Sequence, residues 1–365
     1  MSSVRLWLVL ALCVGLLLSS GWVQLASAAG GEEKSVSTPQ VKEEGKPEGK
    51  DEAKEEGKTE EKKEDECPAT FGPIITDTAV PIEKGKFAVQ PTFGLGFVTN
   101  NLTQSWRRVS AGGNFKTFGM DWKFTYGLIK NMEIFVVVPF ANNWANSVNE
   151  PGPNGERSAS FGGLGDVNLT MKYQLLEEGP KNPTVTALFA TGYPTGHFRS
   201  LNPGRLDTDN LGGGAYAFTT GLNTSKCLKP FILYANLWYT MQTAYTSMES
   251  HTHMTLNENG EMVEGPAESI NLRNYPRDFV TVNLAAEYLI TDKWIALLEL
   301  TSYWDGGRLF GHQANLPPGA LVSVNPGIEY MVSDKLGFAM SVNFDLCGKN
   351  ASTAITPLVS CMYQF

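Results

Sequence analysis

Strict alternation of apolar and polar side chains is the feature that most limits what this 365-residue chain can fold into. Within 116–127 five large apolar side chains, Phe118, Met120, Trp122, Phe124 and Tyr126, fall on one face. The opposite face consists of Thr117, Gly119, Asp121, Lys123 and Thr125. Successive side chains of a β-strand point to opposite faces, so this pattern predicts a strand with an apolar face and a polar face.

The same period of two recurs along most of the chain. About twelve such segments begin near residues 86, 116, 132, 163, 183, 211, 230, 277, 294, 320, 336 and 354. No run of 18 or more apolar residues follows the N-terminal region, which argues against membrane helices. The pattern predicts an all-β fold, a transmembrane antiparallel up-and-down β-barrel of about 12 strands.

The lengths of the connections favour this barrel over a water-soluble β-sandwich. Short turns are expected near 129–131, 177–182, 225–229, 291–293 and 333–335. They alternate with long connections near 99–115, 141–162, 194–210, 247–276 and 306–319. Short periplasmic turns and long external loops are typical of outer-membrane barrels, whereas a sandwich gives no reason to separate loop lengths by end.

Outward-phase aromatic residues near the short turns support the same fold. They are Tyr126, Tyr173, Tyr288, Tyr330 and Tyr363. Amphipathic rings favour the lipid headgroup level, so these tyrosines predict a periplasmic girdle. The chain ends on Phe365 in an outward phase, which resembles the signal through which the barrel-assembly machinery recognises its clients.

The N-terminal region predicts export. Residues 1–28 combine Arg5, an apolar run from Leu6 to Leu18 and a small-residue cleavage site after Ala28, as signal peptides do. A retained helical anchor is the alternative, but the run is shorter than the roughly 20 residues that span a bilayer. We expect the mature protein in the outer membrane of a Gram-negative-type cell, in contact with its lipid.

Residues 29–66 form a Glu/Lys-rich spacer with 14 acidic residues against 8 lysines. This segment has almost no large apolar side chain, so it is predicted to be a disordered periplasmic tether. The barrel is then expected over 67–365. With a formal net charge of −9, nothing in the sequence suggests a nucleic-acid partner.

The polar phase of the strands defines a predicted lumen. Its members are Asp121, Lys123, Asp166, Asn168, Lys172, Asn283, Glu287, Glu299, Asn325, Glu329, Asn343 and Asp345. Charges cost about 2–4 kcal/mol on the lipid face near the midplane, so they are expected to point inward. Two interpretations stay open: a hydrated, cation-preferring passage, and a closed interior in which lysines and carboxylates pair.

Four segments together resemble a known family. They are 76–87 (TDTAVPIEKGKF), 125–139 (TYGLIKNMEIFVVVP), 163–174 (GLGDVNLTMKYQ) and 190–196 (ATGYPTG). They are similar to the outer-membrane family named for the MetA pathway of phenol degradation. The resemblance implies a barrel described as a transporter of apolar or aromatic compounds, with no catalytic residues to carry over. The spacer is not part of that pattern.

Enzyme chemistry is not expected. The four histidines, His197, His251, His253 and His312, all fall in predicted loops, and none has a serine placed to share one point with it. No cofactor is predicted. Glu249, His251 and His253 in the loop sequence MESHTHM are weak candidates for a soft metal, although an exposed loop often carries such residues by chance.

Four cysteines remain after cleavage. Cys67 and Cys227 are both expected on the periplasmic side, where they could form a disulfide. Cys347 and Cys361 are not expected to bond, because the last hairpin would set Cys361 opposite about Met340. Two functions survive: a channel or transporter for a small solute that the sequence does not name, and a non-conducting structural or surface-binding barrel.

Overall fold

The computed structural model describes residues 70–149, 156–256 and 262–365. Residues 68–179 and 183–365 belong to one compact unit, and everything below concerns that unit. Within it, no helix is long and apolar enough to cross a membrane.

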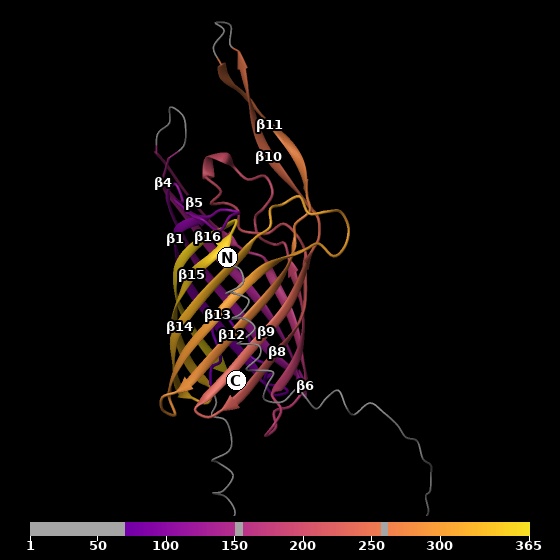
Figure 1. Ribbon diagram of the computed structural model, residues 1–365, viewed down its shortest axis with the longest axis vertical. Helices are drawn as coiled ribbons and strands as arrows, with labels where there is room; N and C mark the ends of the chain where they lie inside the picture. The colour runs from indigo at the N-terminus through magenta and orange to yellow at the C-terminus, as the bar shows by residue number, and fades with distance from the viewer. Residues whose placement is uncertain (1–69, 150–155, 257–261) are drawn as a thin grey trace, which may run out of the picture. The chain divides into compact units, whose positions relative to one another are not determined.

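Twelve strands of the described chain close into an antiparallel barrel (Figure 1). They are β1 (Phe87–Leu102), β3 (Asn114–Ile129), β4 (Met132–Asn149), β6 (Val167–Leu176), β7 (Thr184–Tyr193), β8 (Ala217–Leu228), β9 (Phe231–Gln242), β12 (Asp278–Leu289), β13 (Trp294–Gly307), β14 (Ala320–Ser333), β15 (Leu336–Lys349) and β16 (Ala351–Gln364). Closure is made by β1 and β16, which pair from Ala88 with Gln364 to Leu102 with Ala351. The predicted all-β barrel and its strand number are confirmed.

Additional strands lengthen the external connections. β5 (Glu156–Leu164) pairs with the outer part of β4, and β2 (Arg108–Val109) pairs with the end of β1. β10 (Tyr245–Leu256) and β11 (Met262–Asn274) form their own two-stranded sheet inside the connection predicted at 247–276. A one-turn 3₁₀ helix, η2 (Pro203–Arg205), lies in the β7–β8 connection.

Two predicted strand starts differ from the structure for a local reason. The strand expected near 163 begins at Val167. Gly163 and Leu164 belong to β5, and Gly165 and Asp166 separate that strand from β6. The strand expected near 211 begins at Ala217, because the glycine-rich residues before it belong to the β7–β8 connection.

The last strand begins at Ala351 rather than near residue 354. β15 ends at Lys349 and β16 begins at Ala351, so only Asn350 joins them. Cys361 consequently pairs with Phe338 rather than with Met340. Cys347 and Cys361 are both free, as expected.

The outer surface of the barrel is apolar, with aromatic rings near the short turns. Tyr126, Tyr173, Tyr288 and Tyr363 are all exposed there. Ring pairs reinforce this belt: Trp294 with Tyr330 at a centroid distance of 4.6 Å, and Phe231 with Tyr288 at 5.1 Å. The predicted girdle therefore corresponds to a real cluster of rings at one end of the barrel.

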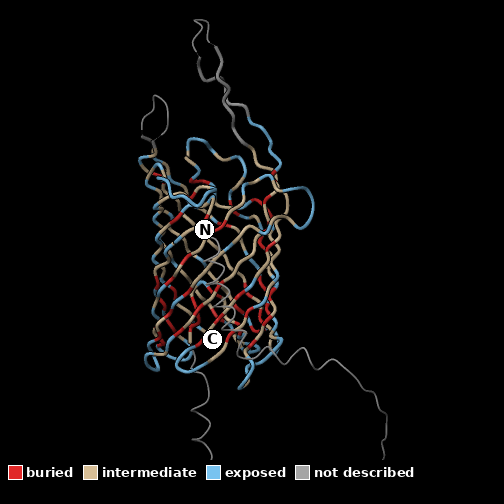
Figure 2. Tube along the Cα trace, viewed as in Figure 1, coloured by how far each residue is buried: buried red, intermediate tan, exposed pale blue. Residues whose placement is uncertain are grey.

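The interior is filled unevenly along the barrel axis. Buried residues gather toward the end with the short turns (Figure 2). Residues 70–86, which precede the first strand, lie inside this end rather than in the wall. Phe71 packs there against Ile295, Met331 and Ala339, all of them buried.

Two glycines on the inward face of β3 show the difference between the two ends. A Cβ at Gly119 would meet nothing within 4 Å, whereas a Cβ at Gly127 would overlap the carbonyl oxygen of Glu83. Gly127 also exchanges backbone hydrogen bonds with the segment, through Gly85 N–H at 2.7 Å and Lys86 C=O at 3.0 Å. The external part of the lumen is open at β3, and the periplasmic part is occupied by the N-terminal segment.

This contrast predicts opposite outcomes for two identical substitutions. Gly127→Ala should lower the free energy of unfolding by about 1–3 kcal/mol, because the new methyl group displaces the chain at Glu83. Gly119→Ala, the matched control, should change it by less than about 0.5 kcal/mol. Urea unfolding of the protein in lipid vesicles, followed by tryptophan fluorescence, measures both values. Equal values for the two variants would mean that residues 83–86 do not contact β3.

Candidate functional site

The N-terminal segment is held in the lumen by polar contacts to its backbone. Glu299 of β13, which is fully buried, accepts the N–H groups of Ile74 at 3.1 Å, Ile75 at 3.0 Å and Thr76 at 2.6 Å. Asn325 donates to the same carboxylate at 2.7 Å. One side chain of the wall therefore satisfies three successive backbone donors that have no strand partner.

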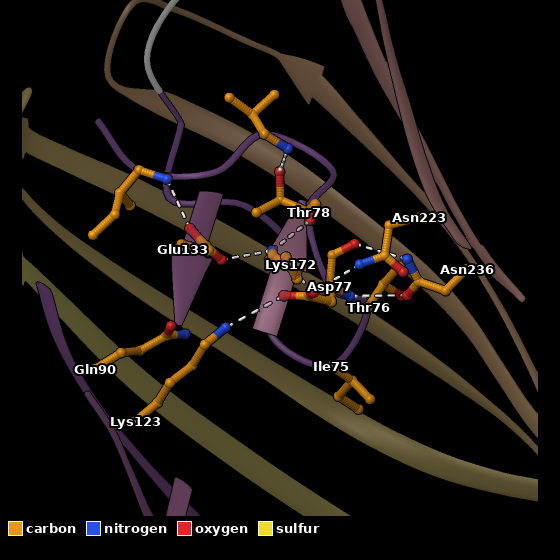
Figure 3. Close-up of polar contacts among 12 residues, drawn as sticks. Ile75, Thr76, Asp77, Thr78, Gln90, Lys123, Glu133, Lys172, Asn223 and Asn236 are labelled. Carbon is orange, nitrogen blue, oxygen red and sulfur yellow. Dashed lines mark hydrogen bonds and ion pairs between the residues drawn. The ribbon is translucent and has the colours of Figure 1, made fainter. Parts of the chain in front are cut away.

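Asp77 is the charged centre of the segment (Figure 3). Its carboxylate lies 3.0 Å from the Nζ of Lys172 and 3.3 Å from the Nζ of Lys123. The side-chain amide of Asn223 donates to it at 2.8 Å. Asn236 accepts the Asp77 N–H at 2.9 Å, so the residue is held through both main chain and side chain.

Lys172 of β6 joins the segment to the wall. Its ammonium contacts Glu133 at 2.8 Å and also donates to the carbonyl oxygen of Thr78 at 2.8 Å. Glu133 in turn accepts the N–H of Ile82 at 2.7 Å. Because Lys172 is fully buried, its charge depends on these partners. We call Asp77, Lys123, Glu133 and Lys172 the lumen lock; two positive and two negative side chains make it neutral overall.

The predicted lumen residues lie at different levels of the barrel. Lys123 and Lys172 are in the lumen lock, while Asn283, Glu287, Glu299, Asn325 and Glu329 are buried in the periplasmic half. Asp121 and Asn168 are exposed on the inward phase of the external half. Asp345 accepts from Ser323 at 2.7 Å and from Asn343 at 3.0 Å, and Asp166 lies at the external rim.

Sequence reasoning missed Asp77, Glu133, Asn223 and Asn236. Glu133 did carry a signal, because it is a single charge in phase with Phe135 and Val137 in the otherwise apolar first half of β4. Asp77 carried none, since the segment around it has no period that indicates what it contacts.

Asp166 organises the external rim. One of its oxygens accepts Gly196 N–H at 2.9 Å and the other accepts Gly213 N–H at 2.7 Å, so it pins both ends of the β7–β8 connection. The hydroxyl of Thr195 donates to Gly165 C=O at 2.7 Å and accepts Val167 N–H at 3.0 Å. These two hydrogen bonds satisfy backbone groups where the strand is interrupted between β5 and β6. The segments GLGDVNLTMKYQ and ATGYPTG therefore meet at this point.

Glycines make this contact feasible. A Cβ at Gly196 would lie 2.8 Å from Gly212 Cα, and one at Gly212 would lie 2.6 Å from an Asp166 oxygen. Both distances are below normal van der Waals contact, so larger residues would push the connection away from Asp166.

The histidine, metal and cysteine predictions have different outcomes. His197 Nδ1 is 2.8 Å from Asp209 C=O, and the His312 ring packs on Tyr275 at 5.0 Å. The side chains of Glu249, His251 and His253 lie outside the described residues, and the described part of the chain holds no group of three or more metal-ligating residues. Cys227 is disulfide-bonded. Cys67 lies outside the described residues, so its pairing with Cys227 stays a prediction.

A family model described as "Putative MetA-pathway of phenol degradation" matches residues 81–354. The chain belongs to this family. The two motifs that meet at Asp166 both lie within the matched region. The family resemblance drawn from the sequence is confirmed.

One solved structure supports the fold of this family member. The chain is similar to the crystal structure of the COG4313 outer membrane channel from Pseudomonas putida F1, with a TM-score of 0.58 and 12% identity over 81% of this chain and 100% of that chain. The translocator domain of autotransporter NalP from Neisseria meningitidis matches with a TM-score of 0.42 and 12% identity, over 78% of this chain and 90% of that one. No curated protein matches the sequence. The fold is that of an outer-membrane barrel.

The lumen lock predicts unequal roles for its two lysines. Lys172→Met should lower the free energy of unfolding by about 3–5 kcal/mol, because Glu133 and Asp77 stay buried without their shared cation. Lys123→Met is the matched control, and its loss should be about 1 kcal/mol or less, because that ion pair is partly hydrated. Urea unfolding in vesicles compares the two variants. A larger loss for Lys123→Met would show that Lys172 is not the residue that holds the segment.

Proposed function

We propose that this protein is an outer-membrane channel or transporter for small solutes, with apolar or aromatic compounds as the solute class. One observation carries the proposal: the lumen is open at the external half of β3 and filled by the chain's own N-terminal segment at the periplasmic half. A closed barrel that only supports external loops has no need for an interior that is open at one end. Membership of a family described by phenol degradation supports the solute class.

In this proposal the N-terminal segment is the barrier. A solute that enters from outside meets exposed polar side chains, including Asp121 and Asn168, before it reaches the lumen lock. Beyond that level the interior is packed, as the Phe71 cluster shows. Passage of a solute therefore requires residues 70–86 to shift. Within the described part of the chain, only noncovalent contacts hold these residues in the lumen.

The same packing favours a second candidate, a non-conducting structural or surface-binding barrel. Fully buried Glu299 and Lys172 fix the segment from two sides of the barrel, which would keep the lumen closed. Conductance distinguishes the two candidates, because a permanently closed barrel carries no current. Neither candidate assigns a catalytic step to the protein.

We propose that the spacer of residues 29–66 lies in the periplasm. Phe71, near the start of the described chain, packs against Ile295, Met331 and Ala339. These residues lie toward the short-turn end of the barrel, which is periplasmic in barrels of this type.

Ion selectivity tests the open half of the lumen. Asp121 is exposed and has no hydrogen-bond or ion-pair partner among the described residues, so it is the carboxylate that a permeating ion would meet. A unit negative charge about 8 Å away in water attracts a cation and repels an anion by ~0.5 kcal/mol each, so the two ions differ by ~1 kcal/mol, or about fivefold in a permeability ratio. In planar bilayers at low salt, Asp121→Asn should therefore lower the cation-to-anion permeability ratio about fivefold, and less as salt screens the charge.

Glu287→Gln is the matched control and should leave the reversal potential unchanged, because Glu287 is fully buried. Glu287, Glu299 and Glu329 are fully buried, so in this proposal they do not set the selectivity of the lumen. The absence of any current in the wild-type protein would favour the non-conducting candidate. An effect of Glu287→Gln equal to that of Asp121→Asn would contradict the closed periplasmic half.

The C-terminal residue tests the proposed route of assembly. Phe365 is exposed, its N–H donates to Phe87 C=O at 2.7 Å, and its ring packs on Tyr363 at 4.7 Å. Deletion of Phe365 should reduce the amount of heat-modifiable barrel in membranes several-fold if the assembly machinery binds this residue. Phe338→Ala, which removes another exposed ring at the same end, is the control and should assemble normally. Normal assembly without Phe365 would exclude this recognition.

A further inference from the structure

A cavity of about 500 Å³ lies at the external end of the barrel. It is bounded by the β7–β8 connection, by the bases of β10 and β11, and by Leu316 of the β13–β14 connection. Cavities of roughly 300–1,000 Å³ are the usual size of small-molecule sites. The β7–β8 connection also reaches the inward face of β4, where Asn143 donates to Thr208 C=O at 3.1 Å. The cavity therefore lies at the entrance to the open half of the lumen, and we call it the entrance cavity.

One wall of the entrance cavity suits an aromatic ring. Phe198 and Tyr245 meet edge to face, with a centroid distance of 5.9 Å and an interplanar angle of 88°. Met248 adds a thioether, fixed by a contact from Ser200 Oγ at 3.8 Å, and Leu201 adds aliphatic surface. Aromatic edges and sulfur both contact ring systems favourably.

The rest of the lining supplies a few polar groups and no positive charge. Asp207, Asn210 and Asn274 belong to it, and no lysine, arginine or histidine does so among the described residues. Burial raises the pKa of the Asp207 carboxyl, although a hydrogen bond from Asn210 opposes this shift. Such a lining accepts a hydrogen bond from a ligand and gives an anion nothing to pair with.

The entrance cavity is built on a fixed frame. Asp166 pins Gly196 and Gly213, the residues that flank this part of the connection. Gly214 has a positive φ of 72°, and a Cβ there would lie 2.7 Å from ring atoms of both Phe198 and Tyr245. The chain therefore depends on a glycine to bring these two rings together.

We propose that the entrance cavity binds a small, neutral aromatic molecule that carries one hydrogen-bond donor. The ring lies against Phe198, Tyr245 and Met248, and the donor faces Asp207 and the two amides. The inference rests on the proposed channel for its biological role, since it names the solute class that is collected at the entrance. Binding itself does not require conduction, so the two proposals fail separately.

Isothermal titration calorimetry of the full-length protein in detergent micelles tests this, with heats of dilution into protein-free micelles subtracted. Three probes separate the features of the ligand: indole, 1-methylindole, which lacks the donor, and indole-3-acetate, which is an anion. Indole should bind at one saturable site. Loss of one hydrogen bond should weaken 1-methylindole about 2- to 10-fold, and indole-3-acetate should bind about tenfold more weakly or not at all.

Variants locate the site. Phe198→Ala should weaken indole binding about tenfold, because it removes half of the edge-to-face pair. Phe310→Ala is the matched control: Phe310 is 70% exposed in an external connection and does not line the cavity. Heat-modifiable migration checks folding. If Phe198→Ala does not fold, Asn210→Ala, in the exposed part of the connection, should weaken indole about 2- to 10-fold and leave 1-methylindole unchanged.

Each calorimetric result supports or overturns a stated part of the proposal. Saturable indole binding that is weakened by Phe198→Ala and not by Phe310→Ala supports the proposal. No saturable binding, or equal binding by all variants, overturns the site. Equal affinity for 1-methylindole overturns the role of the donor, and tighter binding of indole-3-acetate overturns the neutral class. If the protein binds indole but carries no current, the binding site is supported and the proposed channel function is wrong.

Discussion

The structure depends first on the absence of water in the bilayer core. Every backbone N–H and C=O at that depth needs a partner within the protein, and a sheet meets this requirement only when it has no open edge. Here the pairing of β1 with β16 removes the edges. Closure also fixes the two faces of every strand, because a slip of one residue would turn the apolar phase into the lumen. The interior therefore receives the polar phase of all twelve strands, and its charges must be paired, hydrated or both.

The two halves of the lumen meet that demand differently. In the periplasmic half Lys172, Glu133 and Asp77 satisfy one another, and Glu299 satisfies backbone donors of the N-terminal segment. In the external half Asp121 is exposed and the space at Gly119 is empty, so water provides the partners. The boundary between the halves is set by how far the segment extends into the barrel. A count of inward-phase carboxylates taken from strand phase alone therefore overstates how many of them a solute in the lumen would meet.

The wall of the barrel was predictable because a wall strand repeats one local rule. Residues 117–127 alternate without exception, and β3 includes all of them. The N-terminal segment was not predictable, because its contacts join residues far apart in the sequence, for example 46 positions for Asp77 and Lys123 and 225 for Ile74 and Glu299. Nor was the contact of Asp166 with Gly196 and Gly213, although both family motifs were visible. Alternation records which face a side chain takes, and it carries no information about what fills the interior.

The ionic character of the lumen lock bears on how the segment could move. A buried ion pair often contributes less than well-packed apolar residues of the same volume would, because both charges lose their hydration. A purely apolar plug would be held more firmly in the closed state, and would expose apolar surface to the hydrated lumen when it left. When Asp77 separates from Lys172, by contrast, water from the external half can solvate both groups. Hydration of both groups lowers the free energy of the displaced segment, and desolvation of the ion pair raises that of the seated segment. In the proposed channel, this smaller difference is what allows the segment to act as a barrier that opens.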